Sequence, residues 1–530
     1  MFFKNPALTC DYYKIAHPFM QPPGTTRVFS TWTARNSKHH PDCPNTVVFG
    51  YQYTIPNCLN AFFKENFFNI PLEELRDEYV SMIKDTFSDN YTDFARFEAL
   101  HKLGYLPIAI YGVPEGTILP TGMPDHVIYN TKPEFAWLPQ YLEDIWSANN
   151  WLPSTSATTA YYRAKLIKKF ADATCDNPAE VTRHMCGDFS MRGHTSVDSA
   201  VISGAAHGLI FDRTATILSN SLLSDYYLAN PGELMRGTPS LEHSVVEQGV
   251  AWMRNRIADG SVPEYCRPYL KKAMADGTWE TNLVAEMCFI LYLIKEVQPT
   301  GVMTYVSDTY DFWGVISKVL PLIKDEILKR KGCFSVRPDS GDPFTIVCGN
   351  KNAGINTPAY NGAMAELFKT FGYTKNGKGC SVLPPQVRLI YGDAITYEIT
   401  EDICAYFKAA GWSLENICFG IGAYTYQYVT RDTRGYAIKA TYCEHKEFGP
   451  TPIFKCPKTA AWKASLKGCC VVNKTDNGYE VVDNLDFNEF LDAVISERSA
   501  YVLKFEDGLL HNLEDFTTIR NRLEKEGNLN

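Results

Sequence analysis

The chain has 530 residues, which favours two or three domains and leaves ample length for a large buried core. Its net charge of −9 and pI near 5.7 argue against a general nucleic-acid-binding surface, although a local basic pocket is compatible with them. Apolar residues make up 45% and charged residues 21%, which excludes a mostly disordered or a fibrous chain.

The sequence shows no segment that could cross a bilayer and no secretory leader. Its best apolar run, Met287 to Ile294, is far shorter than the roughly 20 residues that a span needs. The 16 cysteines include no C-x-x-C pair and the 11 histidines no H-E-x-x-H, so we expect free thiols and no structural metal. These features predict a cytoplasmic protein that binds neither membranes nor nucleic acid.

Residues 1–165 mix strand-like and helix-like patterns. Alternating apolar and polar residues predict half-buried strands, and one segment has helical spacing. The predicted strands are 27–35, 46–55 and two within 105–124, and the helix is 71–87 with Leu75, Tyr79, Met82 and Ile83 on its apolar face.

The pattern changes over residues 166–429, where short apolar strands alternate with helical stretches. Parallel strands buried on both faces have this pattern, and helices must connect them. The predicted strands are 303–308, 334–339, 387–393 and 417–423, with a helix at 313–330. We therefore predict a (β/α) barrel over 166–429 that carries the active site.

Residues 430–530 return to strand-like segments and end in a predicted helix. We expect this region to pack with residues 1–165 as one mixed α/β domain.

Three aspartates share the same position relative to these strands. Asp308, Asp339 and Asp393 each stand where an apolar strand ends. In a (β/α) barrel the carboxyl ends of the strands converge on one face, where active sites lie. A single such aspartate is better explained as the N-cap of the next helix. Three in register favour a shared site.

Two loops after strands suit phosphate binding. In R-P-D-S-G-D-P (337–343), Arg337 suits a phosphate, and Asp339 suits ribose hydroxyls or hydrated Mg²⁺. The alternative is a turn with a local Asp–Arg pair. The small residues of F-G-I-G-A (419–423) let backbone N–H groups approach a phosphate, and Arg431 and Lys439 follow downstream, either beside that site or on a solvated face.

Other motifs suit ring binding or phosphate transfer. Phe189 precedes Arg192 by three residues, and an aromatic face with a guanidinium suits a flat heteroaromatic ring, although a core Phe and a surface Arg explain it too. His243, beside Glu242, is a candidate general base or phosphate-accepting nucleophile, although lone histidines are more often structural. The D-Y-Y-K cluster at 11–14 is better explained, from its residues alone, by a packing pair of tyrosines.

These motifs occur in an order that is specific when taken together. They are D-Y-Y-K, V-F-G-Y-Q-Y, V-P-E-G, G-D-F-S-M-R-G, E-H-S, V-S-D-T-Y-D, R-P-D-S-G-D-P, L-P-P-Q-V-R-L-I-Y-G-D, F-G-I-G and T-R-D. In this order the chain resembles the nicotinamide phosphoribosyltransferases, from about Asp11 to Gly468 and more weakly beyond.

The resemblance implies the type II phosphoribosyltransferase fold, a (β/α) barrel beside a mixed α/β domain. It implies that nicotinamide and phosphoribosyl pyrophosphate give nicotinamide mononucleotide and pyrophosphate, a step of NAD salvage. It also implies a homodimer with shared active sites, Mg²⁺ held mainly through the pyrophosphate donor, and ATP as an activator through His243.

The resemblance also assigns roles to single residues. Phe189 would stack on one face of the pyridine ring, with Arg192 near the carboxamide, and Tyr13 of the partner subunit would cover the other face. The remaining expected contacts are Asp308, Arg337, Asp339, Gly392 and Asp393 around the ribose and pyrophosphate; Arg35 and Arg388 on phosphates; Gly422, Ala423 and Tyr424, with Arg431 and Lys439 of the second chain, on the 5′-phosphate; and Lys455 and Lys463 near a phosphorylated His243. The expected catalytic residues are His243, Asp308, Asp339 and Asp393.

One departure from the family concerns the acceptor. Aligning I-S-G-A-A-H-G-L-I-F-D-R-T-A-T puts Ala215 where the family has an aspartate that bonds the carboxamide. A carboxylate there would repel nicotinic acid, so its loss leaves nicotinic acid as an alternative acceptor. Asp212 replaces it only if the loop shifts register.

A second departure concerns the donor. The family's Gly-Gly-Gly run reads G-A-Y at 422–424, and Ala437 replaces a serine. Tyr424 and Tyr426 would edge a more open site with a ring available for stacking. Such a site suits a larger donor with ADP on the ribose 5′ position, which would give NAD directly, as in some phage-encoded relatives. The alternative is drift around a retained phosphate site.

Two other classes of function are weaker alternatives. A catalytically weak homologue could act as a binding protein, but a binder does not need Asp308, Arg337, Asp339, Asp393 and His243 together. A nicotinamide-nucleotide hydrolase fits less well, because the arginines suit retention of a pyrophosphate leaving group.

Overall fold

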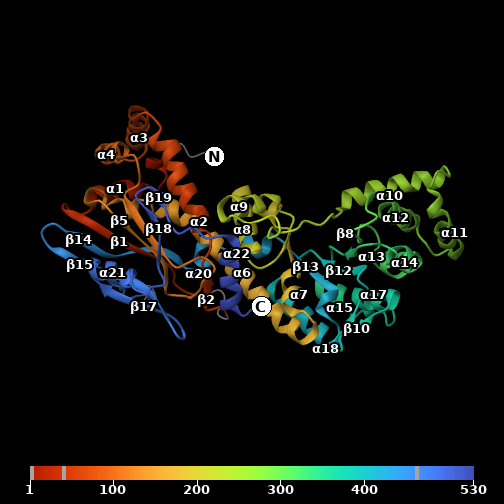
Figure 1. Ribbon diagram of the computed structural model, residues 1–530. Coiled ribbons are helices and arrows are strands. Elements are labelled where there is room, and N and C mark those ends of the chain that lie inside the picture. Colours follow the sequence, from red (N-terminus) through yellow and green to blue (C-terminus); the bar gives the residue numbers. More distant parts are fainter. Residues whose placement is uncertain (1–4, 39–42, 460–464) are drawn as a thin grey trace. The chain divides into compact units, whose positions relative to one another are not determined.

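The computed structural model describes residues 5–38, 43–459 and 465–530. The chain divides into two units, whose elements are labelled in Figure 1. The first unit contains Met1–Thr159, Ser221–Glu233 and Val429–Asn528, and the second contains Ala160–Asn220, Leu234–Tyr428 and Leu529–Asn530. The segment Ser221–Glu233 thus lies in the first unit, whereas the sequence analysis assigned all of 166–429 to the barrel.

A seven-stranded antiparallel sheet organises the first unit, in the order β15-β14-β1-β5-β3-β18-β19. Its strands are β1 (Thr25–Ala34), β3 (Ile108–Gly112), β5 (Pro124–Asn130), β14 (Tyr436–His445), β15 (Gly449–Pro452), β18 (Val502–Glu506) and β19 (Leu509–Leu510). Because β14 pairs with β1, segments from both ends of the chain build one sheet.

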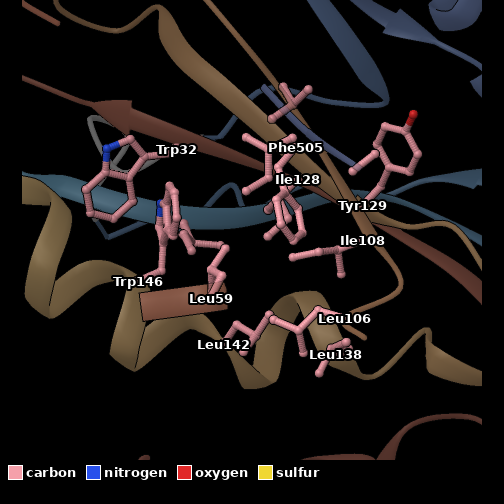
Figure 2. Packing of buried hydrophobic residues seen from close by; sticks show 14 of the residues in the cluster. Trp32, Leu59, Leu106, Ile108, Ile128, Tyr129, Leu138, Leu142, Trp146 and Phe505 are labelled. Carbon is pink, nitrogen blue, oxygen red and sulfur yellow. The ribbon is translucent and has the colours of Figure 1, made fainter. Parts of the chain in front are cut away.

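The core of the first unit joins this sheet to helices. Trp32 of β1, Ile128 of β5 and Phe505 of β18 are almost fully buried, and Figure 2 shows them near Trp146. Each such burial stabilises the fold by about 1.5–3 kcal/mol. The indole Nε1 of Trp146 donates a 2.8 Å hydrogen bond to Nε2 of His126, so its polar edge is satisfied inside the core.

The other elements of the first unit complete its shell. They are η1 (Pro6–Leu8), α1 (Tyr12–Met20), β2 (Asn45–Val47), α2 (Tyr51–Thr54), η2 (Ile55–Ala61), η3 (Lys64–Phe68), α3 (Leu72–Thr86), η4 (Asp89–Tyr91), α4 (Ala95–Leu103), β4 (Ile118–Pro120), η5 (Pro133–Phe135), α5 (Leu138–Tyr141), α20 (Arg431–Arg434), β16 (Cys469–Thr475), β17 (Gly478–Leu485), α21 (Phe487–Val494) and α22 (Phe516–Gly527). The predicted helix at 71–87 is confirmed as α3, but Met82 is 45% exposed and does not share its buried face.

The predicted strand over 46–55 is wrong in its second half, because the chain turns at Gly50 and enters α2. Gly50 has a φ of +107°, and a Cβ atom there would lie 2.3 Å from Cγ of Pro153. The carboxylate of Glu115 accepts hydrogen bonds from the N–H groups of Gly50, at 2.9 Å, and Gln52, at 2.6 Å. A distant buried acid therefore stabilises this turn.

A six-stranded parallel sheet organises the second unit, in the order β7-β6-β13-β12-β9-β8. Its strands are β6 (Cys186–Asp188), β7 (Arg213–Thr214), β8 (Met303–Val306), β9 (Phe334–Arg337), β12 (Val387–Tyr391) and β13 (Ile417–Ile421). The last four confirm the strands that the sequence predicted in this region.

A segment without regular strand structure, residues 236–240, joins the two edges of the parallel sheet; we call it the closing segment. Arg236 forms a parallel bridge with Arg213 of β7, and Ser240 forms one with Thr304 of β8. The curled sheet thereby closes into a ring, which confirms the predicted (β/α) barrel.

Helices connect the strands of the barrel. They are α6 (Glu143–Thr174) and α9 (Ile217–Tyr227), which both contribute residues to the two units, with α7 (Pro178–His184), η6 (Met191–Gly193), α8 (Val197–Gly208), α10 (His243–Ala258), η7 (Glu264–Cys266), α11 (Arg267–Asp276), α12 (Thr281–Tyr292), η8 (Leu293–Val297), α13 (Phe312–Gly314), η9 (Val315–Val319), α14 (Leu320–Leu328), α15 (Pro343–Cys348), α16 (Pro358–Asn361), α17 (Ala363–Phe371), α18 (Tyr397–Ala410), η10 (Leu414–Asn416) and α19 (Ala423–Gln427); β10 (Thr374–Lys375) and β11 (Ser381–Val382) form a small hairpin. Among the described residues, none of the helices combines the length and the apolar character that a membrane span requires.

Candidate functional site

Asp308 and Asp339 meet at the carboxyl ends of the neighbouring strands β8 and β9. The backbone N–H of Asp339 donates to Oδ2 of Asp308 at 2.8 Å, and the hydroxyl of Ser340 donates to the same oxygen at 2.6 Å. Nε of Arg337 lies 3.8 Å from Oδ1 of Asp339. The strand ends thus bring together two carboxylates and a guanidinium that the sequence singled out separately.

Two charged atoms of this cluster are left without hydrogen bonds. The side chain of Asp308 is only 4% exposed, and within the described part of the chain its Oδ1 has no hydrogen-bond partner. The same holds for Nε of Arg337, whose Nη2 donates to the carbonyl of Leu241 at 2.9 Å. Oδ1 of Asp308 faces His243 and Nε of Arg337 faces Asp339, each at 3.8 Å and so beyond hydrogen-bond distance. Buried polar atoms without hydrogen bonds are costly, so both atoms are suited to hold a ligand group of opposite charge.

His243 reaches the same cluster from the start of α10. Its Nδ1 lies 3.0 Å from the hydroxyl of Thr309, and its Nε2 lies 3.8 Å from Oδ1 of Asp308. The side chain is 43% exposed. The imidazole is therefore oriented through one nitrogen, while the other is accessible beside a carboxylate.

Gly392 and Asp393 follow β12, the next strand of the sheet. A Cβ atom at Gly392 would lie 2.8 Å from Oδ1 of Asp339, so a larger residue there would displace this carboxylate. The hydroxyl of Tyr391 donates to the carbonyl of Ser340 at 2.9 Å and further fixes the pair of loops. The Asp393 side chain is exposed at this rim.

Phe189 follows β6, and two glycines make room for its ring. Cβ atoms placed at Gly187 and Gly420 would lie 3.1 and 3.2 Å from ring carbons of Phe189. The backbone N–H of Phe189 donates to the carbonyl of Ile421 at 2.8 Å. Arg192 follows in η6 with an exposed side chain, and both residues line the same cavity. The ring and the guanidinium therefore lie along one cavity, and their predicted roles in binding a heteroaromatic ring stay predictions.

Asp188, which the sequence analysis did not single out, anchors this loop from below. It is completely buried and accepts hydrogen bonds from the N–H of Ser190 at 3.0 Å and from the hydroxyls of Ser190 and Thr216 at 2.5 and 3.0 Å. The only signal was its place inside the G-D-F-S-M-R-G motif. It fixes the direction of Phe189 without facing the cavity.

Ala215 lines the cavity at the position where the resemblance predicted a lost carboxylate. Its backbone N–H donates to the carbonyl of Asp188 at 2.8 Å. Asp212 does not replace the carboxylate, because its Oδ2 lies 2.5 Å from Nδ1 of His184. The loop therefore keeps its register.

The barrel encloses a cavity of about 1,450 Å³. Phe189, Arg192 and Arg337, which lie at or after the carboxyl ends of strands, line part of it. Residues before the amino ends of strands, such as Cys333, line another part. Arg388 also lines it, but its Nη1 donates to the carbonyl of Val387 at 2.7 Å and points back along the strand. Arg388 therefore does not join the Asp308–Asp339 cluster. The volume exceeds what a single pyridine ring fills.

The predicted phosphate loop opens α19, with Gly422 and Ala423 directly after β13. The exposed rings of Tyr424 and Tyr428 stack with centroids 4.7 Å apart and an interplanar angle of 12°. The prediction is wrong for Tyr426, which is buried with its hydroxyl 2.6 Å from Nδ1 of His207. Along a short helix, residues four apart share a face, so Tyr428 and not Tyr426 joins Tyr424.

The remaining predicted cations lie in the first unit, where they gather around Lys439. Burial lowers the pKa of Lys439, the nearby carboxylate of Glu143 opposes this, and the positive charges of Arg35, Lys455 and Arg431 lower the pKa further. Nε of Arg35 donates to the carbonyl of Gly435 at 2.6 Å. Four cations in one place form a site suited to an anion such as a phosphate.

Tyr13 is a further predicted site residue of the first unit. Tyr13 of α1 is 52% exposed, and its pKa is raised to about 12 by burial and by the nearby Asp144. Its ring is therefore neutral and available at the surface. Lys463 lies outside the described residues.

The family model of the nicotinate phosphoribosyltransferase (NAPRTase) family matches residues 184–485. The nicotinamide phosphoribosyltransferase of Acinetobacter baylyi is 34% identical over 493 residues, which cover 90% of each chain. That of Mycoplasma pneumoniae is 30% identical over 482 residues, covering 87% of this chain and 94% of the relative. The chain belongs to the nicotinate phosphoribosyltransferase family.

Solved structures agree with this family assignment at the level of the fold. Human nicotinic acid phosphoribosyltransferase aligns with a TM-score of 0.56 and 13% identity, covering 97% of this chain and 93% of that one. The nicotinate-nucleotide pyrophosphorylase of Pyrococcus furiosus aligns with a TM-score of 0.54 and 14% identity, covering 100% and 98%. The predicted phosphoribosyltransferase fold is confirmed, and the protein is an enzyme of this family.

Proposed function

We propose that the enzyme transfers the phosphoribosyl group of phosphoribosyl pyrophosphate to nicotinamide, in NAD salvage. The observation that carries this proposal is the cluster at the carboxyl ends of β8 and β9. There Oδ1 of Asp308 and Nε of Arg337 have no hydrogen-bond partner among the described residues, and Arg337 lines the same cavity as Phe189. The choice of nicotinamide is supported by the relatives that bear this name, at 34% and 30% identity.

The reaction asks little covalent chemistry of the side chains. The bond between the anomeric carbon and the pyrophosphate oxygen breaks, its electron pair leaves with pyrophosphate, and the lone pair of the pyridine nitrogen forms the new bond. Asp339 and Asp393 would stabilise positive charge on the ribose, while Arg337 would stabilise the departing anion. Phe189 would hold the pyridine in line, which contributes orientation.

Mg²⁺ fits this site as an ion bound mainly by the donor. Among the described residues no group of three or more His, Cys, Asp or Glu side chains could hold a metal alone. Mg²⁺ is usually bound through one or two carboxylates and substrate phosphates, and here Asp308, with its free Oδ1, and Asp339 would supply the carboxylates. When bound, the ion neutralises charge developing on the pyrophosphate.

ATP would act through His243, whose accessible Nε2 lies beside Asp308. In this proposal Nε2 attacks the γ-phosphorus, and the electron pair of the broken P–O bond leaves with ADP, which gives a phosphohistidine. The test is incubation with γ-labelled ATP. An acid-sensitive label on the wild type that is absent from His243→Ala would establish the phosphohistidine. Stable, acid-resistant label would contradict it.

A homodimer with shared sites would bring the first-unit cations to a second copy of the barrel. Support comes from the exposed Tyr13 and from the cluster of Arg35, Arg431, Lys439 and Lys455, whose positive charges would suit a phosphate held in the site of another chain. Sedimentation of the wild type and complementation between Tyr13→Ala and Phe189→Ala chains would test sharing. We also propose a cytoplasmic location, supported by buried thiols that form no disulfide, such as those of Cys186, Cys288 and Cys404.

The stacked, exposed rings of Tyr424 and Tyr428 favour a second candidate donor. They lie directly after the loop that would hold the 5′-phosphate, and an aromatic face there suits an adenine ring. A donor with ADP on the ribose 5′ position would then give NAD directly. Ala215 likewise leaves nicotinic acid as a second candidate acceptor.

One product assay by mass spectrometry distinguishes these candidates. Protein and Mg²⁺ are mixed with nicotinamide or nicotinic acid and with either donor. Nicotinamide mononucleotide from the simple donor supports the main proposal. NAD formed only from the extended donor supports the second. Ligand binding without turnover would instead support a binding protein.

A further inference from the structure

Arg163 is a buried guanidinium of α6 that contacts two loops of the barrel. The residue is only 3% exposed. Its Nη1 donates to the carbonyl of Thr396 at 3.1 Å and to the hydroxyl of Thr400. Its Nη2 donates to the carbonyl of Ile395 and to the hydroxyl of Thr425, both at 3.4 Å.

The contacts of Arg163 give no reason why a charged side chain at this position would stabilise the fold. Its hydrogen bonds go to uncharged carbonyl and hydroxyl oxygens, and within the described residues its Nε has no hydrogen-bond partner. Burying an ion without an opposite charge is costly, and apolar packing would serve stability as well. The need for an arginine here therefore lies in its ability to donate hydrogen bonds to four acceptors at once.

The first loop held by Arg163 carries Asp393. Between Asp393 and Ile395 stands Ala394, whose φ of +52° lies in the left-handed region that residues other than glycine rarely adopt. Thr396, which follows Ile395, is the N-cap of α18, and its side chain accepts a hydrogen bond from the backbone of that helix. Only a few residues therefore separate the end of β12 from the start of α18. Such a turn persists only if the surrounding structure holds it.

The second loop held by Arg163 follows the neighbouring strand. Thr425 lies in α19, and its backbone N–H donates to the carbonyl of Gly422 at 3.1 Å. The two strands are adjacent and parallel, with Tyr391 of β12 opposite Phe419 of β13. One guanidinium thus ties the Asp393 turn to the start of α19.

We propose that Arg163 is a positioning residue that holds the Asp393 turn and the Gly422 loop in register around the ribosyl donor. The inference rests on the proposed function for its kinetic consequence, but the tie between the loops stands on geometry alone. Arg163 does not face the cavity lining and takes no part in the bond changes.

Arg330 offers a matched control in the same unit. It is 5% exposed, its Nη2 donates to the carbonyl of Gly301 at 3.2 Å, and among the described residues its Nε also lacks a hydrogen-bond partner. It precedes β9 and contacts Gly301, which precedes β8, near the bridge between Thr300 and Lys331, at the amino ends of these strands. It is therefore chemically similar and differently placed.

Amide hydrogen exchange tests the tie without any substrate. In Arg163→Met, peptides over 392–400 and 422–428 should exchange faster than in the wild type, with β8 and β9 unchanged. Arg330→Met should leave those two peptides unchanged. Arg163→Lys keeps the positive charge, so the exchange rates of its two peptides should lie between those of the wild type and Arg163→Met. This variant replaces Arg163→Met in the test if the methionine variant does not fold. Unchanged exchange at both peptides in folded Arg163 variants would overturn the tie.

Kinetics test the positioning role. With the donor that the wild type uses, Arg163→Met should raise KM and lower kcat for an overall loss of about 10- to 100-fold, with partial rescue in Arg163→Lys. Arg330→Met should keep the kcat and KM of the wild type even if it loses as much thermal stability as Arg163→Met. Loosened loops with unchanged kinetics would overturn the positioning role. A wild type without turnover would refute the proposed function, while the exchange result would still decide the tie.

Discussion

Oδ2 of Asp308 accepts the backbone N–H of Asp339 at 2.8 Å. An acid at the end of one strand therefore sets the position of the acid at the end of the next. The second oxygen of Asp308 lacks a hydrogen bond among the described residues, so the side chain both orients its neighbour and remains able to bind.

Asp339→Ala should abolish transfer and leave the fold intact. Its carboxylate makes a single 3.8 Å pair with Arg337, which is worth little to stability, whereas loss of electrostatic stabilisation at a reacting centre typically costs at least about 100-fold in kcat. Product formation and thermal unfolding measure the two effects. Ser340→Ala, which removes a hydroxyl beside it, is the control and should retain most activity. Near-normal turnover of Asp339→Ala would remove this residue from the reaction.

Phe189→Ala should raise KM for the pyridine acceptor by about 10-fold or more, because an aromatic stacking partner is typically worth 1–3 kcal/mol when its ring is lost. Phe189→Tyr keeps the ring and should stay within about threefold of the wild type. Steady-state kinetics with varied acceptor at saturating donor give the answer. An unchanged KM in the alanine variant would place the acceptor elsewhere in the cavity.

Ala215→Asp should increase the preference for nicotinamide over nicotinic acid by about 10- to 100-fold, since a carboxylate in the cavity wall repels an anion and accepts from an amide. The comparison is the ratio of kcat/KM for the two acceptors. Ala215→Asn has the same shape without the charge and should shift the ratio much less. Equal shifts in both variants would show that shape alone decides.

Glu115 should make stability depend on pH. Burial raises the pKa of this carboxyl to about 7 against an ordinary value of 4.5, so folding favours the neutral form. The stability that the protonated form contributes is complete below about pH 4.5 and is lost as the pH rises through about 7.

Glu115→Gln does not titrate. The free energy of unfolding of the wild type should therefore fall relative to this variant by up to about 3 kcal/mol between pH 4.5 and 7.5. Denaturant unfolding at a series of pH values measures the difference. A difference independent of pH would mean that the Glu115 carboxyl has the same pKa in the folded and unfolded protein. Glu78→Gln, at an exposed carboxyl, is the control.

The barrel strands were predictable because their apolar runs and terminal aspartates are local signals. The turn at Gly50 was not, because it depends on Pro153 and on the acid Glu115, which are distant in sequence. The closing segment was also missed, since its strand-like role shows only in two isolated bridges with β7 and β8.

The acidic part of the site followed from residue type and strand position, because neighbouring parallel strands end on one face. The directions of side chains did not follow. Arg388 points back along β12, which no spacing in the sequence reveals, and Tyr426 turns into the core towards His207 because the loop after Gly422 is helical. Arg163 escaped notice because a single arginine in a helix has no local signature.

The closing segment has a consequence for how the protein behaves when it is perturbed. Without it, β7 and β8 would be open edges with unpaired backbone groups, and such edges recruit strands from other chains. Residues 236–240 therefore act as a guard against aggregation as well as a wall of the cavity. Partial unfolding that begins there would expose the edges of β7 and β8, and these edges would pair with strands of other copies of the protein.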